Sequence, residues 1–86
     1  MENSPKNVWV VIAAYNEESV IRAVVSDVRT TVSNVVVVDD CSRDKTSDEA
    51  FAGGAVVVRH PINRGQGAAL QTGMTYALRQ NADIII

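Results

Sequence analysis

The 86-residue sequence contains little that could cross-link it or anchor it in a membrane. Its single cysteine, Cys41, excludes an internal disulfide framework and favours a reducing, cytoplasmic setting. The longest apolar runs have the length of strands and fall well below the roughly 18 residues that span a bilayer. The segment from Met1 to Pro5 lacks the charged and apolar regions of a signal peptide. The sequence therefore indicates a soluble intracellular domain.

Neither positive nor negative charge is in large excess. Eight lysines and arginines against ten aspartates and glutamates give a net charge of −2, and the basic residues form no run. A nucleic acid is therefore not expected as a partner. The only histidine, His60, has no cluster of metal-ligating companions, so it is expected to be a surface residue. Hydrophobic residues make up 47% of the chain, which suits one small domain over residues 1–86.

Apolar, β-branched runs alternate with helical patterns along the chain. The runs Val8–Ala14 and Val35–Val38 are typical of parallel strands buried on both faces. Further strands are expected over residues 55–58 and from residue 82 to the last residue. Apolar spacing predicts helices over residues 17–32, from residue 44 or 46 to 52, and over residues 67–80. This order predicts an α/β fold, a three-layer, Rossmann-like parallel sheet that is truncated in its fourth strand.

Individual residues predict the helix borders and faces. Asn16 is expected to cap the first helix, with Glu17 and Glu18 against the positive end of its dipole. Asp44 or Thr46 is expected to cap the second helix, and two glycines end it. The third helix carries one stripe of small residues that can press on the sheet and one of large residues expected in the core. These stripes are Ala69, Gly73 and Ala77, and Leu70, Met74 and Leu78.

Polar residues follow the carboxyl ends of the predicted strands. Tyr15 comes after the first strand, Asp39 and Asp40 end the second, and the loop Asn63–Gly67 leads into the third helix. Ligands of parallel sheets bind beyond these strand ends, so the segments should converge there. A carboxylate can accept hydrogen bonds from the N–H groups of uracil or guanine, and glycines allow close backbone approach. The alternative is that the aspartates form only a solvated turn and that Tyr15 merely covers the sheet.

Three segments together carry a resemblance to a known family. They are Ala13-Ala-Tyr-Asn-Glu17, Val38-Asp-Asp-Cys-Ser-Arg-Asp44 and Asn63-Arg-Gly-Gln-Gly-Ala-Ala69. In this order and spacing they resemble the opening of the family 2 glycosyltransferases with the GT-A fold. Within that family they are most similar to the dolichyl- and polyprenyl-phosphate mannose or glucose synthases. The resemblance implies that residues 1–86 are the N-terminal, nucleotide-sugar-binding part of a GT-A domain.

The resemblance also implies which residues bind the nucleotide sugar. Asp40 matches the aspartate that hydrogen-bonds the nucleobase, and Glu17 matches a carboxylate near the base and ribose. Arg64 could offer its guanidinium to phosphate oxygens. Many relatives have proline at the position of Ala13 and glycine at that of Cys41. The implied nucleotide-sugar site consists of Ala13, Tyr15, Glu17, Val38, Asp40, Asn63, Gly65 and Gly67. For Glu17, stabilisation of the helix dipole is an equally good explanation.

Full-length relatives are expected to transfer a sugar from a UDP- or GDP-linked donor to an acceptor such as polyprenyl phosphate. The resemblance implies that this reaction takes place at the cytoplasmic face of a membrane, with Mg²⁺ or Mn²⁺ expected to neutralise the departing diphosphate. The family's Asp-x-Asp metal motif follows a strand like residues 82–86, where this sequence stops. The 86 residues are therefore expected to hold no metal ion and no catalytic residue, and to be inactive alone.

Two other functional classes share features with this sequence. A dinucleotide-binding oxidoreductase is disfavoured because Leu70 stands where the fingerprint requires a third glycine. The other class is a non-catalytic interaction module. Its chain would form homo-oligomers through the apolar strand at residues 84–86, which leaves an unpaired edge.

Overall fold

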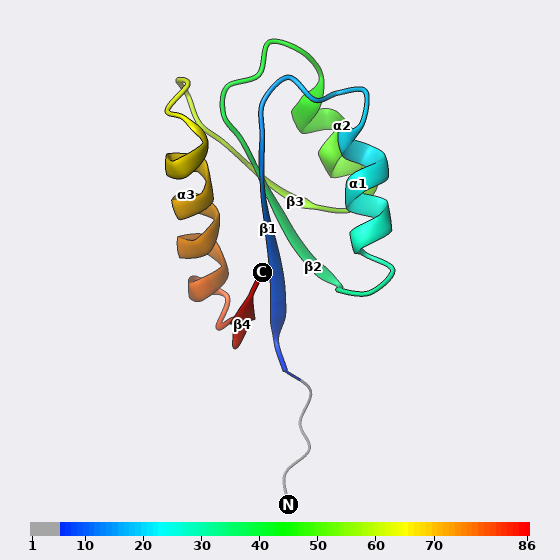
Figure 1. Ribbon diagram of the computed structural model, residues 1–86, viewed down its shortest axis with the longest axis vertical. Coiled ribbons are helices and arrows are strands. Elements are labelled where there is room, and N and C mark those ends of the chain that lie inside the picture. The colour runs from blue at the N-terminus through cyan, green and yellow to red at the C-terminus, as the bar shows by residue number, and fades with distance from the viewer. Residues whose placement is uncertain (1–5) are drawn as a thin grey trace, which may run out of the picture.

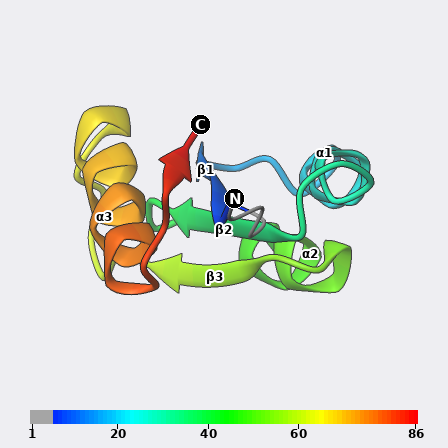
Figure 2. The same cartoon turned by 90° about the horizontal axis from the view of Figure 1, so that it is seen from below.

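The centre of the fold is a sheet of four parallel strands in the order β3-β2-β1-β4. The computed structural model describes residues 6–86. The strands are β1 (Val8–Ala14), β2 (Asn34–Asp39), β3 (Val56–Arg59) and β4 (Ile84–Ile85), and the helices are α1 (Ile21–Val28), α2 (Thr46–Gly53) and α3 (Gln66–Arg79). Helices α1 and α2 cover one face of the sheet and α3 covers the other (Figures 1 and 2). The predicted three-layer α/β fold is confirmed.

Strand β2 is the most deeply buried element of the sheet. It pairs with β1 from Asn34 to Asp39 and with β3 from Val36 onward, and helices cover both of its faces. Its valines therefore need no alternation with polar residues, as the continuous run indicated. Strand β1 is less covered than predicted: only Trp9 and Ala14 are buried, because β4 pairs with β1 only at its first two residues.

The two faces of the sheet form separate apolar clusters. Toward α1 and α2, Val35 and Val37 pack with residues that include Ile21 and Val25. Toward α3, Val36 and Trp9 pack with Ala77, and the Trp9 ring meets Tyr76 edge-on at 5.6 Å between ring centroids. Each fully buried valine or isoleucine stabilises the fold by about 1.5–3 kcal/mol through removal of apolar surface from water. Strand alternation thus distributes the core over both helical layers.

Helix α3 lies against the sheet through its small residues. Ala69, Gly73 and Ala77 are buried, which confirms the predicted close contact, and a Cβ atom on Gly73 would lie 2.3 Å from Val11 Cγ1. The prediction that the large stripe lies in the core was wrong. Its members lie about 100° further round the helix, since the helix has 3.6 residues per turn. The exposed fractions of Leu70, Met74 and Leu78 are 37%, 46% and 62%, respectively.

Helix α1 is shorter than the predicted helix over residues 17–32. Residues 17–20 form turns instead, in which the Glu17 carbonyl accepts hydrogen bonds from the N–H groups of Val20 and Ile21. Asn16 does not cap the helix, because it has a left-handed conformation with φ 53° and its side chain accepts a hydrogen bond from Arg43 N–H at 2.9 Å. The first turn of α1 contains no acidic residue. The prediction that Glu17 and Glu18 face the dipole of this helix was therefore wrong.

Strand β1 has the predicted bounds, and the other boundaries differ from the predicted ones by at most two residues. Asp44 accepts the N–H of Thr46 at 3.0 Å, but neither predicted residue is the N-cap of α2: that position is Lys45, which makes no side-chain cap hydrogen bond. Gly54, with φ 107°, ends that helix in the left-handed conformation that glycine adopts without cost. Within residues 6–86, no helix is long and apolar enough to cross a membrane.

Asp39 ties β2 to its neighbours at the carboxyl end of the sheet. Its buried carboxylate accepts hydrogen bonds from Ser42 N–H at 2.9 Å, from the Ser47 hydroxyl and from the Arg59 guanidinium at 2.8 Å. Burial alone would raise the pKa of Asp39, but the hydrogen bonds from Ser42 and Ser47, together with the charge on Arg59, outweigh it and lower the pKa. Asp39 is therefore ionised in the folded chain, and its carboxylate stabilises the fold in that form.

Replacement of Gly73 by alanine tests the close approach of α3. Gly73→Ala must push α3 away from Val11, and we expect a loss of about 1–3 kcal/mol in the free energy of unfolding, measured by urea denaturation. Gly67→Ala is the matched control. A Cβ on Gly67 meets nothing within 4 Å, so this change should be neutral or stabilise the helix by up to about 1 kcal/mol. Equal stabilities of the two variants would contradict the packing described here.

Acid titration tests the Asp39 cluster. Because the pKa of Asp39 in the folded chain lies below the ordinary value of 3.8, ionised Asp39 stabilises the fold above that value. This contribution is lost as the pH falls from 3.8 through the lower folded-state pKa. We expect Asp39→Asn to lower the stability at neutral pH and to flatten the acid loss, as measured by urea denaturation across about pH 2–6. An unchanged acid slope in the variant would refute this account.

Candidate functional site

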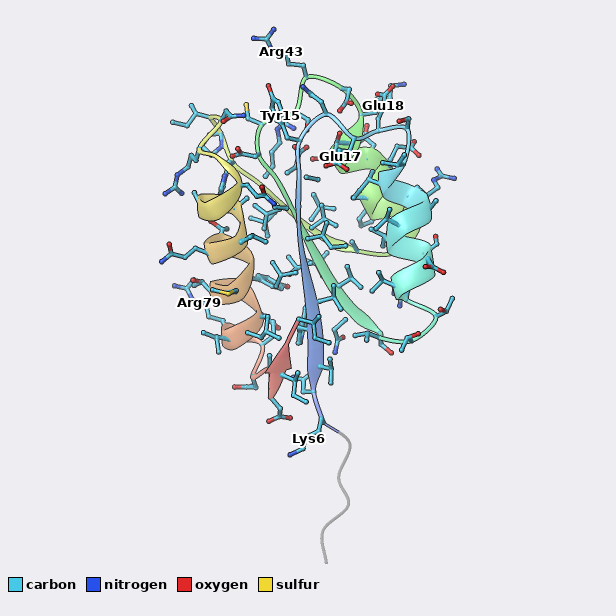
Figure 3. The ribbon with its side chains drawn as sticks, in the orientation of Figure 1. Lys6, Tyr15, Glu17, Glu18, Arg43 and Arg79 are labelled. Atoms are coloured by element: carbon cyan, nitrogen blue, oxygen red, sulfur yellow. The ribbon has the colours of Figure 1, made fainter. Side chains whose placement is uncertain are left out.

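A pocket of about 330 Å³ opens at the carboxyl ends of β1 and β2, and we call it the strand-end pocket. It brings together six of the eight predicted site residues, and Figure 3 shows Tyr15 and Glu17 at this end of the sheet. The convergence follows from the parallel sheet, whose strands all deliver their carboxyl ends to one edge. The complete lining is Ala13, Ala14, Tyr15, Glu17, Asp40, Asn63, Gly65, Gln66 and Ala69.

The two remaining predicted residues do not line this pocket. Val38 is fully buried beneath it, in contact distance of Gly73 on α3. Gly67 lies in the first turn of α3 and is exposed. Arg64 lines a different groove of about 400 Å³, between α3 and β3, and not the strand-end pocket. Its backbone N–H nevertheless donates a hydrogen bond to Asp40, which does line the strand-end pocket.

Asp40 accepts more hydrogen bonds than any other side chain that lines the pocket. The residue is 4% exposed, and its own N–H donates to the carbonyl of Ala14 at 2.9 Å. Oδ1 accepts hydrogen bonds from His60 Nδ1 and from the N–H of Arg64, both at 2.8 Å. Oδ2 accepts one from the N–H of Gly65 at 2.7 Å. The alternative prediction of a solvated turn is wrong for this residue.

These hydrogen bonds keep Asp40 ionised. The Arg64 N–H and then the His60 ring hold the pKa of Asp40 below its usual value, and the Gly65 N–H adds to this, although burial acts in the opposite direction. A carboxylate that is ionised at neutral pH can only accept hydrogen bonds. The pocket therefore presents a fixed acceptor, suited to a ligand with an N–H or O–H donor.

His60 belongs to this cluster, although the sequence did not predict it as a site residue. It is 4% exposed, and its Nε2 lies 2.8 Å from the Thr72 hydroxyl on α3 while Nδ1 contacts Asp40. The predicted surface position was wrong because His60 directly continues β3, where its N–H donates to the Asp39 carbonyl at 2.9 Å. Its place right after a predicted strand, level with the other strand ends, was the signal that could have identified it.

The last residue of β2 and the residue after it form two side-chain pairs with the corresponding residues of β3. Asp39 pairs with Arg59 toward α2, and Asp40 pairs with His60 toward α3. Successive side chains of a strand point to opposite faces, so the register of β2 and β3 fixes both pairs at once. The first pair stabilises the sheet, and the second faces the pocket.

Hydrogen bonds between two loops shape the rim of the pocket. The loop after β1 and the loop after β2 are joined by five of them, each between a backbone N–H and a side chain of the other loop. Glu18 belongs to this set: its carboxylate accepts the N–H of Lys45 at 2.8 Å. The side chains that accept these bonds are Asn16, Glu18, Ser42, Asp44 and Thr46. The Thr46 hydroxyl also lowers the pKa of Asp44 by hydrogen bonding to it.

Two residues at the pocket have a left-handed backbone. Gly65 has φ 97° and ψ 161°, a conformation that is essentially restricted to glycine, and it directs its N–H at Asp40. Cys41, directly after Asp40, has φ 66°, a conformation that glycine adopts more readily than other residues. The glycine at position 65 is thus required by backbone geometry, and the Asp40 contact depends on it.

The residues of the pocket do not fit a divalent metal ion. Across residues 6–86, no group of three or more histidine, cysteine, aspartate or glutamate side chains is placed to hold one. Asp40 is engaged with His60 and Asp39 with Arg59, and a single further carboxylate, that of Glu17, lines the pocket. No metal-dependent step can be assigned to this part of the chain.

Comparison with curated proteins gives relatives that are about three times as long. An uncharacterised protein of Methanocaldococcus jannaschii is 43% identical over 86 residues, which cover 99% of this chain and 35% of the relative. The UDP-N-acetylglucosamine–dolichyl-phosphate N-acetylglucosaminyltransferase of Methanococcus voltae is 29% identical over 99 residues, covering 94% of this chain and 39% of the relative. The chain thus spans little more than a third of the length of these relatives.

A solved structure shows the same fold. Glucosyl-3-phosphoglycerate synthase of Mycobacterium tuberculosis, in complex with Mn²⁺, UDP-glucose and phosphoglyceric acid, matches with a TM-score of 0.73. The sequence identity is 29%, and the match covers 94% of this chain and 32% of the synthase. The family model for glycosyl transferase family 2 matches residues 9–86. The chain therefore belongs to glycosyl transferase family 2.

Proposed function

We propose that the strand-end pocket binds the nucleotide of a nucleotide-sugar donor. The observation that carries the proposal is the Asp40 carboxylate, which is held ionised and oriented in a pocket at the carboxyl edge of a parallel sheet. A nucleobase can donate an N–H to this acceptor. The uridine nucleotides named for the Methanococcus transferase and the Mycobacterium synthase support a UDP-linked donor.

The other lining residues have groups that suit the rest of the nucleotide. The half-exposed ring of Tyr15 offers a surface for the base, and base–aromatic stacking contributes about 1–3 kcal/mol in other proteins. Glu17 can accept hydrogen bonds from ribose hydroxyls, since its side chain lines the pocket and its N–H is fixed on Thr46 at 2.8 Å. Asn63 and Gly65 let the ligand approach the backbone of the loop before α3.

Sugar transfer itself is proposed for the longer proteins that share this segment. The Mycobacterium synthase binds Mn²⁺ together with its UDP-glucose, whereas residues 6–86 offer no fitting metal ligands. We therefore propose that these 86 residues alone bind a donor without transferring its sugar. The dolichyl phosphate in the name of the Methanococcus relative supports a lipid-phosphate acceptor, and for the longer protein we propose a location at the cytoplasmic face of a membrane.

A second candidate function is self-association as an interaction module. Among the described residues, β4 pairs only with β1, and Ile84 and Ile86 are exposed. The large stripe of α3 adds exposed apolar surface on the helix that lies beside β4 (Figure 2). An unpaired apolar edge next to an apolar helix face favours association between copies.

A titration tests donor binding. We expect UDP to bind the wild-type chain equally well with and without Mn²⁺, measured by calorimetry and by NMR shifts of the pocket residues. Asp40→Asn should weaken UDP binding about 10- to 100-fold, because a hydrogen bond to a charged group contributes about 1.5–3 kcal/mol. Asp48→Asn, on the exposed side of α2, is the matched control and should bind as the wild type does. Equal UDP affinities of a folded Asp40→Asn variant and the wild type would exclude Asp40 as a ligand group.

Sedimentation velocity tests self-association. The wild-type chain should show a concentration-dependent dimer or larger species, which Leu78→Glu should disrupt by placing a charge on the apolar surface. Val20→Glu is the matched control: Val20 is an exposed valine just before α1, on the opposite side of the sheet from α3. A wild-type chain that remains monomeric at high concentration would argue against the interaction module.

A further inference from the structure

The hydrogen bonds of Asp40 leave it little free accepting capacity. An ionised carboxylate has about four acceptor positions, two on each oxygen. His60 Nδ1 and the Arg64 N–H occupy both positions on Oδ1, and the Gly65 N–H occupies one on Oδ2. One acceptor position remains, on Oδ2. A ligand in the strand-end pocket can therefore make one good hydrogen bond to Asp40.

This count discriminates between the two candidate bases. Uracil presents a single N–H, at N3, between two carbonyl groups that only accept hydrogen bonds. Guanine presents two adjacent donors, the N1–H and the amino group, which a carboxylate binds by using both of its oxygens. With Oδ1 already filled, Asp40 can accept the single N–H of uracil but only one of the two guanine donors. An unpaired buried donor is costly, and such losses are a strong source of specificity.

We propose that His60, held by Thr72, is the residue that orients Asp40 and makes the pocket select uracil over guanine. The proposal rests on the proposed function, namely that the pocket binds a nucleotide. His60 lies beneath the pocket and does not line it, so it acts through Asp40 as a positioning residue.

The hydrogen-bond directions follow from the charge on Asp40. Because an ionised carboxylate only accepts, Nδ1 of His60 must carry the hydrogen and donate it. In the neutral ring Nε2 is then an acceptor, and the Thr72 hydroxyl donates to it over 2.8 Å. Thr72 thereby fixes both the tautomer and the plane of the ring. Since His60 is almost completely buried, water has little access to replace Thr72.

Thr72 offers a test away from the ligand. It lines the groove between α3 and β3 and not the strand-end pocket, and its hydroxyl is hydrogen-bonded to His60, so we expect its effect on nucleotide binding to pass through His60. Thr72→Val removes the hydroxyl and keeps the shape of the side chain. Thr72→Ser keeps the hydroxyl and is the conservative control. His60→Phe removes both hydrogen bonds of the ring and serves as the stronger variant.

The experiment compares UDP, GDP and N3-methyl-UDP, which lacks the donor, by calorimetry on each folded variant. The wild type should bind UDP at least about tenfold more tightly than either other nucleotide. In Thr72→Val and His60→Phe, the preference for UDP over GDP and the preference for UDP over N3-methyl-UDP should both fall several-fold. Thr72→Ser should keep both preferences. A thermodynamic cycle over residue 72 and the N3–H then gives a non-zero coupling. In ¹⁵N NMR of the ligand-free wild type, His60 should carry its hydrogen on Nδ1.

The outcomes separate this inference from the function on which it rests. If the folded wild type binds no nucleotide, the proposed function is wrong and the specificity falls with it. If UDP binds but GDP binds equally well, only the specificity is overturned. If Thr72→Val weakens UDP and N3-methyl-UDP by the same factor, the role of His60 is merely structural. Should His60→Phe fail to fold, the Thr72 pair of variants still decides the question.

Discussion

Two adjacent buried carboxylates at the end of β2 set the conditions for the rest of the structure. A buried negative charge is stable only when hydrogen bonds and opposite charge compensate its lost hydration. Because neighbouring side chains of a strand point to opposite faces, Asp39 and Asp40 need partners in different helical layers. Strand β3 supplies one partner for each, Arg59 and His60, in the same register. The charges thus fix how β3, α2 and α3 are placed around β2.

The pocket is a consequence of the same compensation. To satisfy Asp40, the loop before α3 turns its Arg64 and Gly65 N–H groups inward, and Gly65 adopts a backbone conformation that side chains disfavour. The loop after β1 is held in turn by the loop after β2 through five hydrogen bonds. The walls of the pocket are therefore ordered without a ligand. Such preorganisation lowers the entropic cost of binding.

The sequence was sufficient for the order of the elements and for the convergence of the strand ends, because both follow from local periodicity and from the geometry of parallel sheets. It was insufficient where the structure depends on contacts between residues that are distant in the sequence. Leu70, Met74 and Leu78 have the same spacing as Ala69, Gly73 and Ala77, and only the approach of α3 to Val11 determines which stripe is buried. His60 is 20 residues from Asp40, and their contact depends on the β2–β3 register, which no local pattern reveals. The side chain of Asn16 has the chemistry of a helix cap, but it accepts a hydrogen bond from the neighbouring loop instead.

The distribution of these contacts separates two tasks that a glycosyltransferase must combine. The three hydrogen bonds that the Asp40 carboxylate accepts come from the segment between β3 and α3. We propose that this segment sets the choice of base. Neutralising a departing diphosphate needs concentrated positive charge, and within the described residues no metal site offers it. On this proposal, recognition draws on groups other than those that carry transfer, so that one base-reading unit is compatible with different sugars and acceptors. The dolichyl phosphate and the phosphoglyceric acid named for two relatives of this segment agree with such a division.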